Sequence, residues 1–323
     1  MPGRIKIGCA PTEIPLRITM VTRTSNRIAI LSFLLAATAA AQTLPPDSSS
    51  TIGPAKQGLF DRVIAKQKNN EQALDLYERL ERVETRKHSS DPAAPSVKTF
   101  RVIPSGTGMD RIPVGPDGQP EDAAAYRAEL ERLEKALALA AQEGRSQRAG
   151  LEKYAKRKKE RNDLIEATRN AFLFKFAARE PRGGRMLARY TMEPNPAFKP
   201  TSRFSTIYTR VRGFVWVDED SEQLARIEGE VTDDISIGLF LGKIYKGSHF
   251  MQERYEFFPG LWLASFSQYD FDGRKLFSGF SIHERTYYSN YRYIGQPAEA
   301  LSVIRKELSS ANLGKSSSTA TDR

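Results

Sequence analysis

The sequence predicts an α+β protein in which long helices come first and a curved antiparallel β-sheet of roughly six to eight strands follows. Two observations lead to this prediction. Apolar residues recur at spacings of three and four over 59–86 and 121–171, as expected of helices. From Ala171 to about Ile294 the period changes to two, and short polar links separate the segments, which is typical of an antiparallel meander.

The first 41 residues have the pattern of a secretory signal peptide. Arg23 and Arg27 precede an apolar run over 28–37, and small residues follow, so we expect cleavage after Ala41. The run is shorter than the roughly 20 residues of a membrane span, and the residues before Met20 fit no part of the pattern, which suggests that translation starts at Met20. These features predict an exported protein of the bacterial periplasm, with a mitochondrial presequence as the alternative. Because no Cys ends the run, we expect no lipid anchor.

Charge and cysteine content argue against nucleic-acid binding and against cysteine-based sites. The net charge of +10 invites a nucleic-acid interpretation, but the leader holds five basic residues and one acidic residue, so the rest of the chain is near +6. With an export signal as well, we expect no nucleic-acid partner. The single cysteine, Cys9, lies in the leader, so the remaining chain has no thiol, disulfide or cysteine-based metal site.

The chain divides into unequal parts. A Pro- and Ser-rich stretch over 42–56 predicts a disordered linker, and 311–323 a disordered Ser/Thr tail. Between them, 57–310 is expected to form a single domain with a helical insertion at 121–169. The later half of 59–86 also alternates, so an edge strand is possible there. A short helix is expected after Pro297.

The strands are expected at eight places, and 235–250 is ambiguous between strand and short helix. Pro259–Gly260 and Asp272–Gly273 are expected to be hairpin turns. The strands cover 97–104, 171–178, 185–192, 213–218, 224–231, 249–258, 261–271 and 275–294.

The first arm of the hairpin at 213–231 is apolar on both faces, which is unusual for a strand with one face in water. Phe214 and Trp216 point to one side of its first arm and Val215 and Val217 to the other, so both faces are apolar. A curled sheet with a cavity on its hollow side explains this pattern. A core packed on both faces explains it equally well.

No motif indicates catalysis or a cofactor, and we expect neither. His88, His249 and His283 lie in separate elements without metal-ligand spacing. The paired carboxylates, at 218–220, at 233–234 and at Asp270 and Asp272, are all expected in turns, where Asp bonds its own backbone.

A basic run at 153–162 has two interpretations. Helical spacing spreads its charges around most of the circumference, which favours a solvated helix face. In the functional alternative, Lys153, Arg157 and Arg161 contact lipid headgroups at an anionic membrane surface.

The hairpin also carries a resemblance to a known family. Gly213, Trp216 and Asp218, followed by Leu224, Arg226 and Glu228, resemble the strand–turn–strand motif of the LolA/LolB-like envelope proteins, the outer-membrane lipoprotein-sorting type. The likeness covers roughly 70–295 and is strongest at 170–290. It implies an incomplete β-barrel with helices packed at its mouth or face, and a concave face that receives acyl chains.

Together these observations favour a non-enzymatic periplasmic protein that binds a lipid or the acyl chain of a lipoprotein. The alternatives are a structural or interaction module of the cell envelope with a self-filled core, and an enzyme that acts through Asp218 or Asp233. The residues expected to line the half-barrel are Phe174, Phe214, Trp216, Leu263, Phe266 and Phe280.

Overall fold

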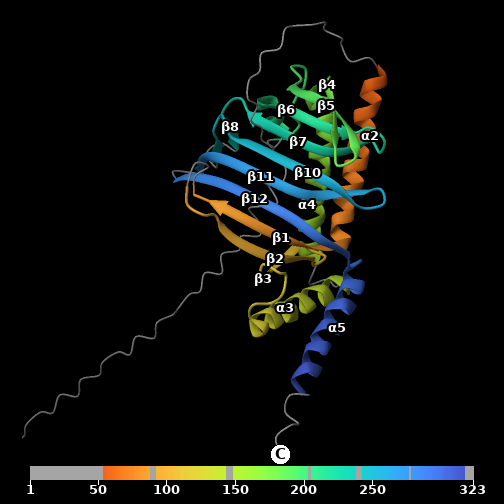
Figure 1. Ribbon diagram of the computed structural model, residues 1–323, viewed down its shortest axis with the longest axis vertical. Helices are drawn as coiled ribbons and strands as arrows, with labels where there is room; N and C mark the ends of the chain where they lie inside the picture. The colour runs from red at the N-terminus through yellow and green to blue at the C-terminus, as the bar shows by residue number, and fades with distance from the viewer. Residues whose placement is uncertain are drawn as a thin grey trace, which may run out of the picture.

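The computed structural model describes residues 54–87, 92–142, 148–202, 205–237, 242–275 and 278–316. Within these ranges the protein is α+β, with a curved, open antiparallel sheet and helices against one face and beyond one edge (Figure 1). The predicted fold class is confirmed, although the sheet has 12 strands rather than six to eight. The predicted leader at 1–41 lies outside the described residues, as do 317–323 of the predicted tail.

The sheet is built mainly from hairpins. Its strand order is β3-β2-β1-β12-β11-β10-β7-β6-β5-β4, while β8 pairs with β9 and β9 with β11. The long jump that places β1 beside β12 joins the first strands to the last one. The strands are β1 (Tyr77–Arg86), β2 (Ser96–Pro104), β3 (Met109–Val114), β4 (Phe172–Arg182), β5 (Arg185–Pro194), β6 (Val211–Asp218), β7 (Gln223–Val231), β8 (Ile235–Ile237), β9 (Gly242–Ile244), β10 (His249–Phe258), β11 (Leu261–Lys275) and β12 (Ser278–Tyr293).

The helices form two pairs. Helices α2 (Pro54–Ala73) and α4 (Arg148–Ala171) contact each other and pack, with the short helix η3 (Ser205–Arg210), on one face of the sheet. Helices α3 (Ala123–Ala141) and α5 (Pro297–Ser316) pack on each other beyond β3 (Figure 1). Asp122 caps α3 by accepting hydrogen bonds from the backbone of Ala124 and Ala125 at 2.9 and 3.0 Å.

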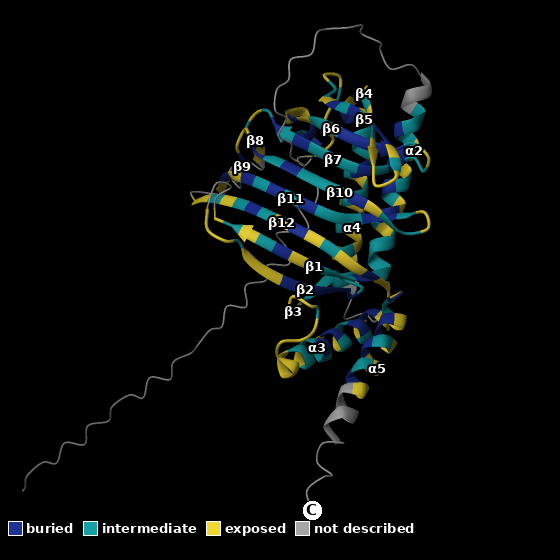
Figure 2. Cartoon of the chain, viewed as in Figure 1, coloured by how far each residue is buried: buried dark blue, intermediate teal, exposed yellow. Residues whose placement is uncertain are grey.

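Each helix pair closes its own hydrophobic cluster. The smaller cluster joins α3 and α5 to Ile103 and Ile112 of β2 and β3. The larger one lies under α2 and α4 and includes residues of strands β4 to β11. Figure 2 shows buried residues along these strands. We call the sheet face under α2 and α4 the inner face; it carries Met192, Val215 and Phe250. The opposite face is the outer face.

The first predicted helix is shorter than expected and starts earlier. Helix α2 begins at Pro54, inside the predicted linker, as suits proline in a first helical turn. It ends at Ala73, and the single turn η1 (Leu74–Leu76) leads into β1. The strand alternative for the later half of 59–86 is therefore right, but β1 is not an edge strand, because it pairs with both β2 and β12.

The predicted turn at Asp272–Gly273 is wrong, because both residues lie inside β11. Gly273 pairs with Phe280 of β12 and with Ile244 of β9. A Cβ at this position would collide with the carbonyl oxygen of Lys243. The glycine permits the close approach of β9 and does not form a turn. The other predicted turn, at Pro259–Gly260, does connect β10 to β11.

The segment 235–250 and the last helix also differ from what the sequence predicts. The ambiguous segment 235–250 forms the short strands β8 and β9 and the start of β10, with 238–241 outside the described residues. Helix α5 continues to Ser316 and so includes the first six residues of the tail predicted from 311. No helix in the described ranges is long and apolar enough to cross a membrane.

Gly213 and Gly229 face each other across β6 and β7. A Cβ on Gly213 would collide with the carbonyl oxygen of Glu228 and lie 2.5 Å from Cα of Gly229. We therefore expect Gly213→Ala to lower the free energy of unfolding by about 3 kcal/mol, because two backbones must separate. Urea denaturation measures this. Gly108→Ala, where nothing lies within 4 Å, is the control; equal stability of the two variants would contradict the prediction.

Candidate functional site

A cavity of about 110 Å³ lies between the inner face of the sheet and helices α2 and α4. Its walls come from six strands, two helices and η3, so the fold rather than a single motif creates it. The lining residues are Phe60, Val63, Ile64, Gln67, Glu71, Ile165, Thr168, Phe172, Phe174, Met192, Tyr208, Val215, Leu224, Ile227, Phe250, Gln252, Arg254 and Tyr269.

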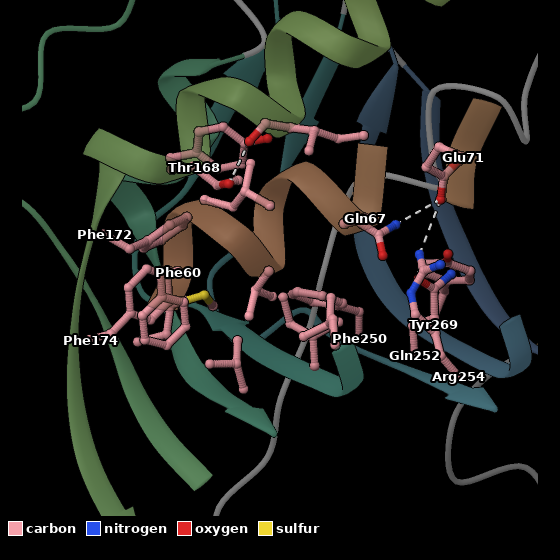
Figure 3. Close-up of a pocket in the computed structure, with 18 residues that line it drawn as sticks. Phe60, Gln67, Glu71, Thr168, Phe172, Phe174, Phe250, Gln252, Arg254 and Tyr269 are labelled. Atoms are coloured by element: carbon pink, nitrogen blue, oxygen red, sulfur yellow. Dashed lines mark hydrogen bonds and ion pairs between the residues drawn. The ribbon is translucent and has the colours of Figure 1, made fainter. Parts of the chain in front are cut away.

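One end of the cavity is aromatic (Figure 3). The ring of Phe60 stacks on that of Phe174, with centroids 3.8 Å apart and planes at 8°, and meets Tyr190 edge-on at 5.0 Å. Phe172 packs edge-on against Tyr208 at 5.3 Å. Phe172 and Phe174 share a face because side chains alternate along β4, as the sequence predicts. This end can contact an apolar guest but offers few polar groups.

The other end of the cavity is polar (Figure 3). The Arg254 side chain is only 5% exposed, and its Nη2 donates to Glu71 Oε1 at 3.1 Å and to Gln252 Oε1 at 2.6 Å. Gln67 Nε2 donates to the same Glu71 oxygen at 3.0 Å. The second Glu71 oxygen accepts a hydrogen bond from Arg161 Nη1 at 3.5 Å.

Two buried polar atoms at this end have no hydrogen-bond partner in the described part of the chain. They are the donor Nε of Arg254 and the acceptor Oε1 of Gln67. A buried polar atom without a partner costs free energy, about 1–3 kcal/mol. Both atoms belong to side chains that line the cavity, so a bound molecule could supply the missing partners.

Helix α2 is fastened to the turn between β6 and β7. Arg62 forms a two-pronged ion pair with Glu222 at 2.7 and 2.8 Å, Lys66 donates to the Ser221 carbonyl at 2.6 Å, and the buried Asn70 donates to Gln223 at 2.9 Å. The fully buried Asp218 shapes this turn by accepting from the Ser221 backbone at 2.8 Å. This is the structural role that sequence predicts for a turn aspartate.

The structure places the six residues expected to line a half-barrel in different environments. Phe174 lines the cavity, and the other five lie outside its lining. Phe214 and Trp216 lie on the outer face, opposite Val215, where Trp216 Nε1 donates to Glu180 at 2.9 Å. Leu263 is fully buried elsewhere on β11, Phe266 packs against Tyr287 at 5.1 Å, and Phe280 packs against the larger core cluster.

Two of the three cations expected to meet headgroups contact the protein itself. Arg157 donates to the Thr107 carbonyl at 2.8 Å, and Arg161 pairs with Glu71. Lys153 is exposed on α4. This distribution agrees better with a helix that combines internal ion pairs and a solvated face than with one continuous basic patch.

The polar cavity residues were missed from sequence, although α2 contains a signal for them. Phe60, Val63, Ile64, Gln67 and Glu71 follow one another at helical spacing and occupy one side of α2. The first three are apolar and the last two polar. A stripe that changes character in this way is easily taken for the end of an amphipathic face. Only the neighbouring strand β10, which supplies Gln252 and Arg254, shows that the polar part is also buried.

His249 and His283 lie in separate strands, as expected, but the sheet brings them together; His88 lies outside the described residues. Strand register places His249, Asp270 and His283 side by side on β10, β11 and β12. Asp270 accepts from His249 Nε2 at 3.1 Å and contacts His283 Nδ1 at 3.0 Å. Asp270 and Asp272 are therefore strand residues and not turn residues. The described residues contain no group of three side chains suited to hold a metal ion.

Comparison with known proteins gives structural matches only. No protein-family model and no curated protein matches the chain. A DUF1329 family protein from Desulfovibrio piger matches with 12% identity over 74% of this chain and 92% of its own, at a TM-score of 0.29. A LolA superfamily protein from Nitrosomonas europaea matches with 8% identity over 75% and 96%, at a TM-score of 0.30.

A third match is a domain from Vibrio parahaemolyticus described as an outer membrane lipoprotein-sorting protein. It is 11% identical over 72% of this chain and 93% of its own, at a TM-score of 0.28. The LolA superfamily is also the group that the hairpin at 213–231 resembles. At such identities and TM-scores the matches do not indicate what this chain binds, so its function has to be argued from the cavity.

The His249–Asp270–His283 row makes a prediction about pH. Burial opposes ionisation of Asp270, but hydrogen bonds from His249, Gln268 and His283 outweigh it and hold its pKa well below the usual range. The hydrogen bond to Asp270 raises the pKa of His249 above its ordinary 6.5. The stability that ionised Asp270 gives the folded protein is lost as the pH falls below the ordinary pKa of 3.8. The stability that protonated His249 gives the folded protein is fully present below pH 6.5. It is lost as the pH rises through the pKa of His249 in the folded state.

We therefore expect Asp270→Asn to lower the free energy of unfolding by about 2 kcal/mol at pH 6, and by less at pH 8. Urea denaturation at both pH values measures this. Asp163→Asn, which removes an exposed pair with Lys159 on α4, is the control and should change stability by a few tenths of a kcal/mol at most. If Asp270→Asn lowers the free energy of unfolding equally at pH 6 and pH 8, the role given to His249 is contradicted.

Proposed function

We propose that this protein binds a lipid, or the acyl chain of a lipoprotein, in the cavity between the sheet and helices α2 and α4, without catalysing a reaction. The observation that supports this most directly is the cavity itself, which is aromatic at one end, polar at the other and covered by one helix pair. The resemblance of the hairpin at 213–231 to lipoprotein-sorting proteins agrees with this function.

The size of the cavity limits what it holds in this conformation. Its 110 Å³ is on the order of a cavity that accepts a benzene-sized guest, roughly 150 Å³. A short part of an acyl chain fits, and each buried methylene contributes about 0.8 kcal/mol. A longer chain requires α2 or the side chains of Phe60 and Phe174 to move aside.

The geometry of the carboxylates supports binding rather than catalysis. Asp218, the first candidate for an enzymatic residue, is fully buried and serves the turn that holds α2. Asp233 lies in the link between β7 and β8. Neither lines the cavity. A chemical step carried out by either aspartate would therefore have to take place outside the cavity.

Location and domain extent are part of the proposal. We propose that residues 57–310 act as one domain in the periplasm after removal of the leader, and that Lys153 contributes to contact with an anionic membrane surface. Expression of the full chain in a Gram-negative host tests the export step. The mature protein is expected in the periplasmic fraction with Gln42 as its first residue, and an uncleaved cytoplasmic product would contradict this.

Binding is tested with cis-parinaric acid, a fatty acid that fluoresces in apolar surroundings. We expect saturable uptake by delipidated protein. Ile227→Trp should reduce the affinity at least tenfold, because Ile227 is partly buried on the inner face and lines the cavity, so that an indole occupies the space. The fluorescence titration measures both.

Leu173→Trp is the matched control. Leu173 is 42% exposed and lies between Phe172 and Phe174 on β4, so its side chain points away from the cavity. This variant should bind like the unmodified protein. If a folded, delipidated protein shows no saturable uptake, the cavity is filled by its own side chains and the alternative of a structural or interaction module holds.

A further inference from the structure

The polar end of the cavity has the features of an incomplete binding site for a charged group. Arg254 is almost entirely buried, yet only its Nη2 donates to Glu71 and Gln252. Its Nε has no hydrogen-bond partner among the described residues. A buried N–H donor without an acceptor costs free energy, so an acceptor supplied by a guest would stabilise this end of the cavity.

The charges at this end are unequal in number. Two guanidinium groups, those of Arg254 and Arg161, contact the one carboxylate of Glu71. Counted over these three groups alone, the formal surplus is one positive charge; the Arg254 side chain is 5% exposed and that of Arg161 is 27% exposed. A positive charge held in a buried site favours an anion more strongly than it would in water, because the surrounding dielectric constant is low. Guanidinium groups bind carboxylates especially well.

The two ends of the cavity also specify the direction of a guest. Phe60 and Phe174 lie at the end opposite Arg254 (Figure 3), with Val215, Ile227 and Phe250 contributing to the apolar wall. A guest that satisfies both ends is a single apolar chain with an anionic terminus. Acyl chains joined as esters or amides have no such terminus.

We propose that the preferred ligand is a free fatty acid, with its carboxylate on Arg254 Nε and its chain directed toward Phe60 and Phe174. This inference rests on the proposed function and gives it a substrate class. A neutral lipid would leave Arg254 Nε without an anionic partner and the surplus charge uncompensated. The fatty acid is therefore expected to bind more tightly than an uncharged molecule of the same length.

Calorimetric titration of delipidated, full-length mature protein with dodecanoate and with dodecanol tests this at pH 8. We expect both to bind, and dodecanoate at least tenfold more tightly. Equal affinities, or tighter binding of dodecanol, would overturn the preference for a carboxylate and leave acyl-chain binding intact. If neither molecule binds, the proposed function fails together with this inference.

Variants separate ligand recognition from structural support. Arg254→Met combined with Glu71→Gln removes both charges of the pair, so that no unpaired carboxylate is left behind. Arg161 remains, but its side chain is 27% exposed and its charge is screened by water. We expect this double variant to bind dodecanol as before and to lose the tenfold preference for dodecanoate. Arg226→Met is the matched control, since Arg226 is a partly buried, ion-paired arginine on the adjacent strand β7 that does not line the cavity.

A double variant that folds and keeps the preference would contradict the assignment of the carboxylate to Arg254. If the double variant does not fold, the comparison of dodecanoate with dodecanol on the unmodified protein still decides the question. A purely structural role for Arg254 predicts a change in unfolding free energy alone, with the ratio of the two affinities unchanged.

Discussion

The packing of helix α2 on the inner face of the sheet determines the character of the cavity. Its buried side begins with Phe60, Val63 and Ile64 and continues with Gln67 and Glu71. The helix therefore covers the sheet with apolar residues over its first turns and with polar residues over the next. Because the strands must complement whatever α2 presents, β4 contributes phenylalanines at one end and β10 contributes Arg254 at the other. One helix thus gives the cavity both its enclosure and its polarity.

The hairpin at 213–231 is apolar on both sides because each side has a separate task. Val215 and Val217 join the core beneath α2 and α4, whereas Trp216 packs with Leu187, Ala225 and Trp262. The Arg226 guanidinium lies over the Trp216 ring at 4.8 Å, an arrangement that covers an aromatic ring with an ion-paired, partly buried charge. The turn of the same hairpin binds α2 through Ser221, Glu222 and Gln223.

The fold class and most strands could be predicted from alternation, because local patterns determine which residues share a face. The length of β11 could not be predicted in this way. Gly273 is required because β9 approaches it closely, but in the sequence, where β9 is not known to be its neighbour, this glycine looks like a turn residue. His249 and His283 likewise meet at Asp270 only through strand register. In the cavity, Phe174 could be predicted from the alternation along its strand. The face of β6 that points inward could not, because it depends on where α2, a helix more than 100 residues earlier in the chain, packs on the sheet.

Stability alone gives little reason for a buried ion pair beside an apolar cavity. Replacing such a pair with apolar residues of similar volume is often neutral or stabilising, and Phe60 and Phe174 show that this interface accommodates close apolar packing. Within the part of the chain that the structure describes, Arg254 Nε and Gln67 Oε1 at this polar end also have no hydrogen-bond partners, which adds to the free-energy cost of burying it. A bound anionic group would offset that cost by completing the hydrogen bonds. The energetic imbalance at this end of the cavity is therefore best explained by a ligand that brings its own charge.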